Sequence, residues 1–327
     1  MLIEPIRRSV AFVGAVALGL GLSIVGCGGD DDTTSMSTTV TATESTTTTG
    51  AATTAAPAAA TTAAPAAATT AAPAAATLVS VYWGWTVLNP PAGSPERIGA
   101  GAREVAADTP VRNALDAMFD GPNPLEQSIG MTTSIPPGTA VLGIAVDGTV
   151  ATVDLSAGFA ASSGSLDEMM RLAQVVFAVT QFDDIDRVKF QIDGVSQDPI
   201  LSHGFEVGDG LTRDDFENVR PTILIEHPYP GADVSESLVI RGESNTFEGT
   251  VRYAITSGGG DGLVVIEGFT TSTSGNGIWG DFEVIVDLSG AGSGYEPGPG
   301  SVIMWEDSAL DGTRLGVVEI PVVLPEL

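Results

Sequence analysis

The sequence is poor in the residue types that most enzymes and nucleic-acid-binding proteins use for their chemistry. Its 327 residues contain one cysteine, two histidines and a single lysine, and 13 Lys and Arg stand against 41 Asp and Glu. One cysteine excludes an intrachain disulfide framework and a thiolate metal cluster. The formal net charge of −28 repels nucleic acid, because phosphate binding needs clustered cations. We therefore expect no nucleic-acid partner, no metal site and no cofactor.

What is present at the N-terminus is the layout of a secretory signal. Arg7 and Arg8 precede an apolar stretch at 10–25, which is shorter than the about 20 apolar residues that a spanning helix needs. The stretch ends in Ile-Val-Gly-Cys at 24–27, which resembles the lipobox of bacterial lipoproteins. The resemblance implies that 1–26 is a signal peptide and that Cys27 carries a diacylglycerol. The protein would then be anchored to the outer face of the cytoplasmic membrane; the alternative is a plain secretory signal with an incidental cysteine.

Residues 27–76 form a low-complexity segment of Thr, Ala, Ser and Pro. The unit TTAAPAAA occurs three times in succession, at 53–60, 61–68 and 69–76. A proline in every repeat removes a helical hydrogen-bond donor, and no side chain here is large enough to build a core. We expect a disordered tether that holds the following domains away from the membrane.

The next segment, 77–195, has the pattern of a two-layer α/β domain. The expected elements are strands at 78–87 and 97–105, a helix from Thr109-Pro110 to Gly121, a hairpin at 140–155 around Asp147-Gly148, a helix begun by a capping box at 165–168 and ending near Phe182, and a strand at 188–192. This order predicts one sheet covered by two helices.

This segment resembles the GerMN domain, a family named from a spore germination and sporulation lipoprotein. The matching stretches are TPVRNALDAMFDGP, SIPPGTAVLGIAVDGTVATVDLSAGF, AVTQF and VKFQIDG. The resemblance covers most of 78–195 and contains no catalytic signature. It implies the α/β fold and a role in the cell envelope.

After a polar connector at 196–221, residues 222–327 have an all-β pattern. Seven strand-like runs are separated by Gly, Ser, Asn or Pro clusters: ILIEHP, LVIRGE, GTVRYAIT, LVVIEGF, DFEVIVDL, SVIMWEDS and LGVVEIPVVL. This is the number of strands in an immunoglobulin-like sandwich, whose core we expect Trp279, Phe282 and Trp305 to fill. The stretches PYPG, NTFEGTVRY, WGDFEV and WEDSALDG resemble the Gmad2 domain, an immunoglobulin-like module found beside GerMN domains.

Three patterns could carry chemistry, and each has a structural interpretation that we prefer. The GxGxxG pattern at 275–280 is followed by a strand, whereas a dinucleotide site needs a helix there. His203 and His227 lie outside any zinc or hydrolase motif, so a Ser/His/Asp hydrolase is a weak alternative.

Carboxylates cluster at three places: Asp183-Asp184-Asp186, Asp214-Asp215-Glu217 and Glu306-Asp307-Asp311. Paired acids could serve a cell-wall glycosidase, but these clusters fall at predicted turns and strand ends, where solvated acids are common.

The sequence thus predicts a non-catalytic, lipid-anchored surface protein with an α/β GerMN-like domain and a β-sandwich. We expect it to be a scaffold or ligand-binding module in envelope processes like sporulation or germination, with an envelope protein or wall component as partner. Two alternatives remain open: an accessory lipoprotein of a membrane sensor kinase, and a cell-wall glycan hydrolase that uses paired carboxylates.

Overall fold

Strand β1 (Ala76–Trp85) is central to the α/β part of the protein. The computed structural model describes residues 75–86 and 96–327, so the predicted signal, Cys27 and nearly all of the tether lie outside the described residues. Over its whole length β1 pairs antiparallel with β2 (Arg97–Ala106), and its last two residues pair with β3 (Met131–Thr132). The aromatic residues of β1 are buried on both faces of this small sheet, with Tyr82 and Trp83 fully inaccessible.

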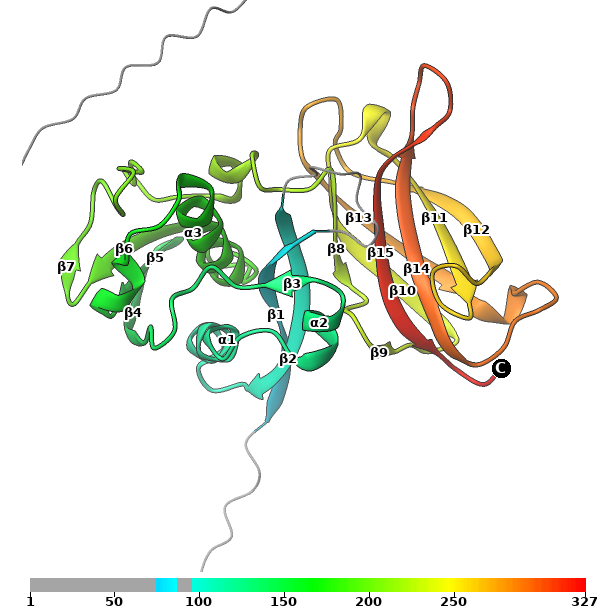
Figure 1. Cartoon of the computed structure of the whole chain (residues 1–327), viewed down its shortest axis with the longest axis horizontal. Helices are drawn as coiled ribbons and strands as arrows, with labels where there is room; N and C mark the ends of the chain where they lie inside the picture. The colour runs from blue at the N-terminus through cyan, green and yellow to red at the C-terminus, as the bar shows by residue number, and fades with distance from the viewer. Residues whose placement is uncertain (1–74, 87–95) are drawn as a thin grey trace, which may run out of the picture. The chain divides into compact units, whose positions relative to one another are not determined.

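The remaining elements of the α/β part agree with the sequence pattern. They are α1 (Pro110–Phe119), α2 (Pro124–Ser128), β4 (Val141–Asp147), β5 (Val150–Leu155), α3 (Ser165–Val179), β6 (Arg187–Ile192) and β7 (Val195–Ser196). The predicted hairpin is β4–β5, and α3 connects β5 to the parallel strand β6. Figure 1 shows α1 and α3 beside β1, which both helices contact. Among the described residues, no helix has the length and apolar character needed to span a membrane.

The prediction of a single sheet in this part is wrong. The order β4-β5-β6-β7 forms a second sheet, separate from β2-β1-β3. Beyond the short pairing with β3, the open edge of β1 is bound by side chains in place of a strand. Gln181 exchanges two bonds with the Ser80 backbone, at 2.7 and 2.9 Å, and Gln174 donates to the Tyr82 carbonyl at 2.7 Å. Side-chain amides satisfy backbone groups as a ladder would, so no strand is needed there.

Residues 222–327 form the predicted sandwich, with all seven predicted strands and an eighth, the two-residue β9 (Ala232–Asp233), that the sequence did not predict. The other strands are β8 (Ile223–His227), β10 (Ser237–Ser244), β11 (Thr250–Ser257), β12 (Leu263–Thr271), β13 (Gly280–Asp287), β14 (Gly298–Asp307) and β15 (Arg314–Leu324). One sheet has the order β12-β11-β14-β15-β9 and the other β13-β10-β8. The alternating burial along β10 shows that one face of this strand is turned inward.

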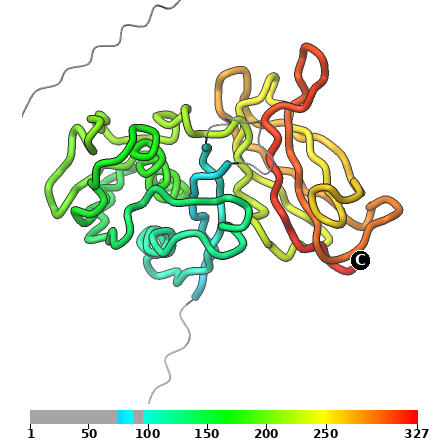
Figure 2. Tube along the Cα trace, viewed as in Figure 1, coloured from blue at the N-terminus to red at the C-terminus, as the bar shows by residue number. Residues whose placement is uncertain are grey.

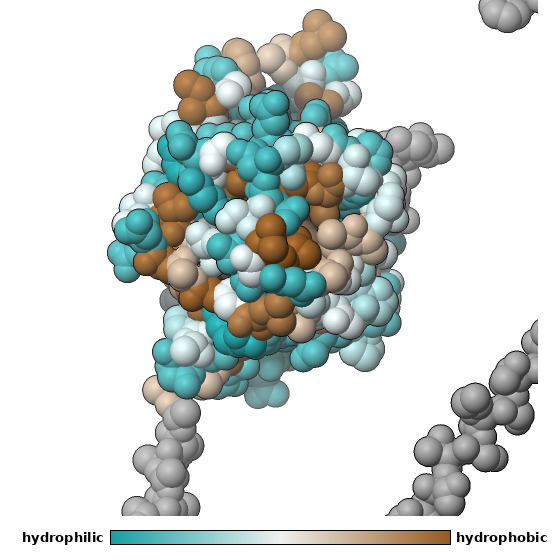
Figure 3. Space-filling view, turned by 90° about the vertical axis from the view of Figure 1, so that its left-hand side faces the viewer, coloured by the Kyte–Doolittle hydropathy of each residue, from teal (hydrophilic) through white to brown (hydrophobic). Residues whose placement is uncertain are grey.

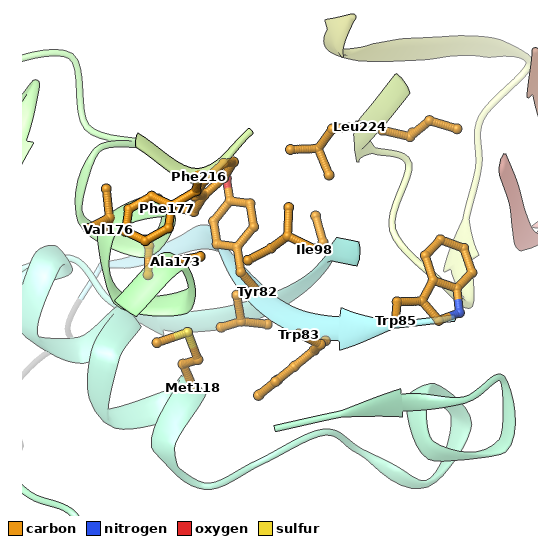
Figure 4. Close-up of a cluster of buried hydrophobic side chains, with 14 of the residues drawn as sticks. Tyr82, Trp83, Trp85, Ile98, Met118, Ala173, Val176, Phe177, Phe216 and Leu224 are labelled. Atoms are coloured by element: carbon orange, nitrogen blue, oxygen red, sulfur yellow. The ribbon is translucent and has the colours of Figure 1, made fainter. Parts of the chain in front are cut away.

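The connector between the two parts contributes to the core. It contains a 3₁₀ turn at Arg213–Phe216, and both Phe216 and Val219 are buried. The Ile98 amide on β2 donates to the Val219 carbonyl at 2.7 Å. Figure 4 shows Phe216 beside Tyr82 and Phe177. The rings of Tyr82 and Phe177 meet edge to face, with their centroids 5.5 Å apart. The chain passes from green to yellow at this connector in Figure 2, and the core continues from one part into the other.

Candidate ligand-binding groove

A polar groove of about 960 Å³ opens where the end of α3 and the start of β1 meet strands β8, β10 and β13. Its charged lining residues are Arg187, Arg213, Arg220, Arg241, Asp183, Asp186, Asp214, Glu226, Glu243 and Asp281. Four of the eleven Lys and Arg residues in the described part of the chain therefore line one groove. In contrast, hydrophilic and hydrophobic surface alternate on the face of the α/β part seen in Figure 3.

Arg213 occupies the floor of the groove and joins the two parts of the fold. Its Nη1 lies 3.0 Å from a Glu226 oxygen and also bonds Glu243, while its Nη2 bonds the Tyr82 hydroxyl at 3.1 Å. The guanidinium also lies over the Phe177 ring, 4.7 Å from its centroid. Burial lowers the pKa of Arg213, but Tyr82, Glu226 and Glu243 raise it to well above its usual value. The floor therefore holds a permanent positive charge.

The Tyr82 hydroxyl completes this floor by donating to Glu226. Burial raises the pKa of Tyr82 well above its usual value, against the lowering effect of Arg213, and the Glu226 charge raises it further. The phenol is therefore neutral at physiological pH and is fixed as a donor. Because β1 carries the phenol and β8 the carboxylate, the bond connects the two parts of the fold.

A second arginine, Arg220, stacks on Trp279 with its guanidinium carbon 3.8 Å from the ring centroid. Its Nη1 bonds Asp214 at 3.0 Å and its Nη2 bonds Glu243. Among the residues that the structure describes, neither Nε of Arg220 nor Nε1 of Trp279 has a hydrogen-bond partner, although both atoms are buried. Trp279 is thus a groove residue, and its predicted place in the core is wrong; Phe282 and Trp305 are buried as expected.

His227 lines the same groove, at the end of β8. Burial lowers the pKa of His227, and the neighbouring charge of Arg241 lowers it further. Its ring meets Tyr229 edge to face at 6.3 Å. A neutral imidazole can both donate and accept, which suits hydrogen bonding to a polar ligand.

His203 is not among the residues that line the groove. It lies beside Ser202 and the buried Glu168. The Nδ1 of His203 is 2.8 Å from one Glu168 oxygen, and Ser202 donates to the other. Ser202 is 3.4 Å from that same Nδ1. A catalytic triad needs the acid and the nucleophile on opposite ring nitrogens, so this arrangement is not a triad. These hydrogen bonds instead hold the connector loop at Ser202 and His203 against the first turn of α3.

The three acidic clusters of the sequence lie where turns and strand ends were predicted, and they do not become a metal site. Among the described residues, no group of three or more His, Cys, Asp or Glu side chains could hold a metal ion. Asp214 binds Arg220, Asp215 binds the Thr212 backbone, and Asp307 binds Arg252 at 2.8 Å. Asp183, Asp184 and Asp186 are exposed.

The GxGxxG pattern is a turn before β13, as predicted. A Cβ on Gly275 would lie 2.4 Å from the Gly249 backbone nitrogen, so the close approach of two loops explains a glycine there. Gly277 has a φ of 95°, which a side chain would strain.

The carboxylates that do meet in the groove, Glu226 and Glu243, were not singled out by the sequence. They come from β8 and β10, and both bond the same Nη1 of Arg213, so the two carboxylates are held close together, as the paired acids of a glycosidase are. Both are already bound to arginine, so their oxygens are engaged within the protein. Side chains paired across a sheet leave no fixed spacing in the sequence, so no motif could have found them.

Two protein families match the chain in tandem. Residues 80–198 match the Germane family, described as sporulation and spore germination. Residues 222–313 match Gmad2, described as the immunoglobulin-like domain of bacterial spore germination. Both matches confirm the resemblances seen in the sequence. No curated protein matches the chain.

Among solved structures, three show similarity to parts of the chain. A candidate lipoprotein of Clostridium perfringens is 18% identical with a TM-score of 0.31, over 44% of this chain and 93% of that one. The first GerMN domain of the Bacillus subtilis sporulation protein GerM is 21% identical with a TM-score of 0.33, over 42% and 99%. The tandem GerMN domains of the same protein are 16% identical with a TM-score of 0.36, over 65% and 62%.

Proposed function

Since the chain joins a Germane domain to a Gmad2 domain, we propose that it is a non-catalytic, lipid-anchored surface protein that binds a ligand or partner of the cell envelope. Both family descriptions refer to sporulation or germination, which supports an envelope process of that kind. More specifically, the protein acts as a ligand-binding scaffold, and its tether presents the two domains and their groove outside the membrane.

The observation that carries this proposal is the groove at the junction of the two domains. The Arg213 network fixes side chains from β1, β8 and β10 in one buried set of bonds, so the floor of the groove is formed before any ligand arrives. Preorganised polar groups in a concave site are what a binding module needs, because little ordering is left to oppose binding.

The anchor is tested at Cys27, which lies outside the described residues. Cys27→Ser removes the thiol that would take the lipid, and we expect the protein to move from the membrane fraction to the soluble or secreted fraction. Two acyl chains give stable anchoring where one binds only marginally, so the shift should be nearly complete. Retention of the variant in the membrane would contradict lipidation.

The binding role is tested by in-cell photocrosslinking from the groove. A crosslinking residue at Asp183, which is exposed and lines the groove, should capture a distinct envelope component. The same residue placed at Leu310, which is 93% exposed and outside the groove, is the matched control. Capture of a sensor kinase would select the signalling alternative. Equal adducts from both positions would argue against a groove function.

A glycan hydrolase remains a second candidate, because Glu226 and Glu243 form a close carboxylate pair in the groove. Incubation of the purified protein with peptidoglycan distinguishes the two: soluble fragments that disappear in the Glu243→Gln variant would indicate catalysis. The binding proposal predicts none.

A further inference from the structure

The groove contains both signs of charge on one face of the sheet β13-β10-β8. His227 lies opposite Arg241 across the β8–β10 pair, and Glu243 lies opposite Asp281 across the β10–β13 pair. Since alternate residues of a strand share a face, Arg241 and Glu243 point to the same side. The wall is therefore an array of fixed donors and fixed acceptors held on strands.

The pairing within the groove argues against a charged ligand. Arg213 and Arg220 are already bound by Glu226, Glu243 and Asp214, so an anion placed beside them would meet three carboxylates. The net charge of −28 adds a long-range repulsion for polyanions. A cation would instead meet the permanently charged arginines. A neutral ligand avoids both costs.

The chemistry of the lining indicates which neutral ligand fits. A hydroxyl group both donates and accepts, so a row of hydroxyls can bond carboxylates and guanidiniums in alternation. A peptide would also offer donors and acceptors, but its apolar side chains gain specificity from apolar pockets, and this groove is lined mainly by polar and charged side chains. Its volume is at the upper end of the about 300–1,000 Å³ usual for ligand sites, which leaves room for more than one sugar ring.

Two unpartnered donors mark a specific point in this groove. Within the part of the chain that the structure describes, the Arg220 Nε and Trp279 Nε1 groups are buried without acceptors, and a buried donor with no acceptor is unfavourable. Both atoms are closed to solvent, so a ligand oxygen can reach them only if the Trp279 loop moves. That loop contains Asn276 and Gly277 in left-handed conformations, beside the exposed Ile278. The indole ring also offers an aromatic surface for a sugar face.

We propose that the groove binds a neutral oligosaccharide, whose hydroxyls bond Arg241 and Asp281 and one of whose oxygens accepts from Trp279 Nε1 and Arg220 Nε. This rests on the proposed ligand-binding role and names the ligand class. Binding moves the Trp279 loop, so the indole both senses and stabilises the complex.

The test is a titration of the full chain in detergent, labelled with ¹⁵N-tryptophan so that each indole N–H gives its own signal. The probes are tri-N-acetylchitotriose, cellotriose, trigalacturonic acid and trialanine. We expect at least one neutral trisaccharide to shift the Trp279 signal and to bind at least tenfold more tightly than the anionic trisaccharide and the tripeptide. A difference in affinity between tri-N-acetylchitotriose and cellotriose shows whether the groove prefers an acetylated or an unacetylated glycan.

Variants locate the site. Trp279→Phe keeps a ring but loses the donor and should weaken saccharide binding at least fivefold, as should Asp281→Asn. Trp305→Phe is the matched control, because Trp305 also lies 3.8 Å from an arginine, but its Nε1 is bound by Asp307 at 2.9 Å. Thermal melting shows whether each variant folds.

The proposal would be overturned if neither neutral saccharide shifts the Trp279 indole signal. It would also be overturned if trialanine shifts that signal with the same affinity as the saccharides. If photocrosslinking at Asp183 still captures an envelope component, the binding role stands and only the ligand class is wrong. If neither experiment gives a groove-specific result, both proposals fail.

Discussion

At the scale of single residues, Glu168 is a buried carboxylate that lies outside the groove and is held by several hydrogen bonds. It is fully buried and accepts bonds from Ser202, the His203 ring and the His203 backbone. Glu168→Gln replaces one acceptor oxygen with a donor that faces other donors, and should cost about 1–3 kcal/mol of unfolding free energy. Thermal or denaturant unfolding measures it. Asp184→Asn, at an exposed position, is the control and should stay within about 0.5 kcal/mol.

The Glu168 carboxylate also makes the stability of the folded protein depend on pH, with less stability at acid pH. Burial raises the pKa of Glu168, but hydrogen bonds from Ser202 and His203 outweigh burial and lower the pKa from 4.5 to about 2. The folded state therefore holds the proton less tightly than the unfolded chain does. The stabilisation is complete above about pH 4.5 and is lost as the pH falls toward 2. We expect the stability difference between the wild type and Glu168→Gln to shrink over this range; a constant difference would refute the assignment.

At the scale of elements, the sequence predicted the strands and helices well but not how the helices begin. Hydrophobic alternation and turn residues located seven of the eight strands of the sandwich, because those signals are local. The capping box at 165–168 was wrong: α3 begins after Gly164, and Glu168 reaches a loop 35 residues away. Thr109 likewise makes no capping bond. Local motifs fail where a distant partner competes for the side chain.

One strand glycine is required by packing. A Cβ on Gly242 in β10 would lie 1.9 Å from the Leu224 carbonyl oxygen on β8, at the register shift between these strands. Gly242→Ala should therefore displace β8 and cost more than about 3 kcal/mol. Gly143→Ala in β4 is the matched control, since its nearest contact would be 3.8 Å, and it should be neutral or slightly stabilising. Equal unfolding curves for the two variants would contradict the close approach.

At the scale of the whole molecule, the sequence identified two domains but not their junction. The connector at 196–221 looked polar and turn-rich, yet it supplies buried Phe216 and both arginines of the groove floor. Tyr82 and Glu226 are 144 positions apart, and no spacing rule links a β1 phenol to a β8 carboxylate. The residues of the groove could therefore not be predicted from the sequence, although most of the strands and helices that carry them could.

The junction makes a prediction about cooperativity. Arg213→Met removes the cation that Glu226 and Glu243 share, so Glu226 loses its arginine partner while Glu243 keeps Arg220. Removal of one partner from a largely buried pair costs about 3–5 kcal/mol. Because Arg213 joins the two domains, calorimetry should show two unfolding transitions where the wild type has one. Arg252→Met is the control: its pair with Asp307 is exposed, it lies within the sandwich, and it should cost at most about 1 kcal/mol. A single transition in Arg213→Met, at the temperature of the control, would show that apolar contacts alone hold the domains together.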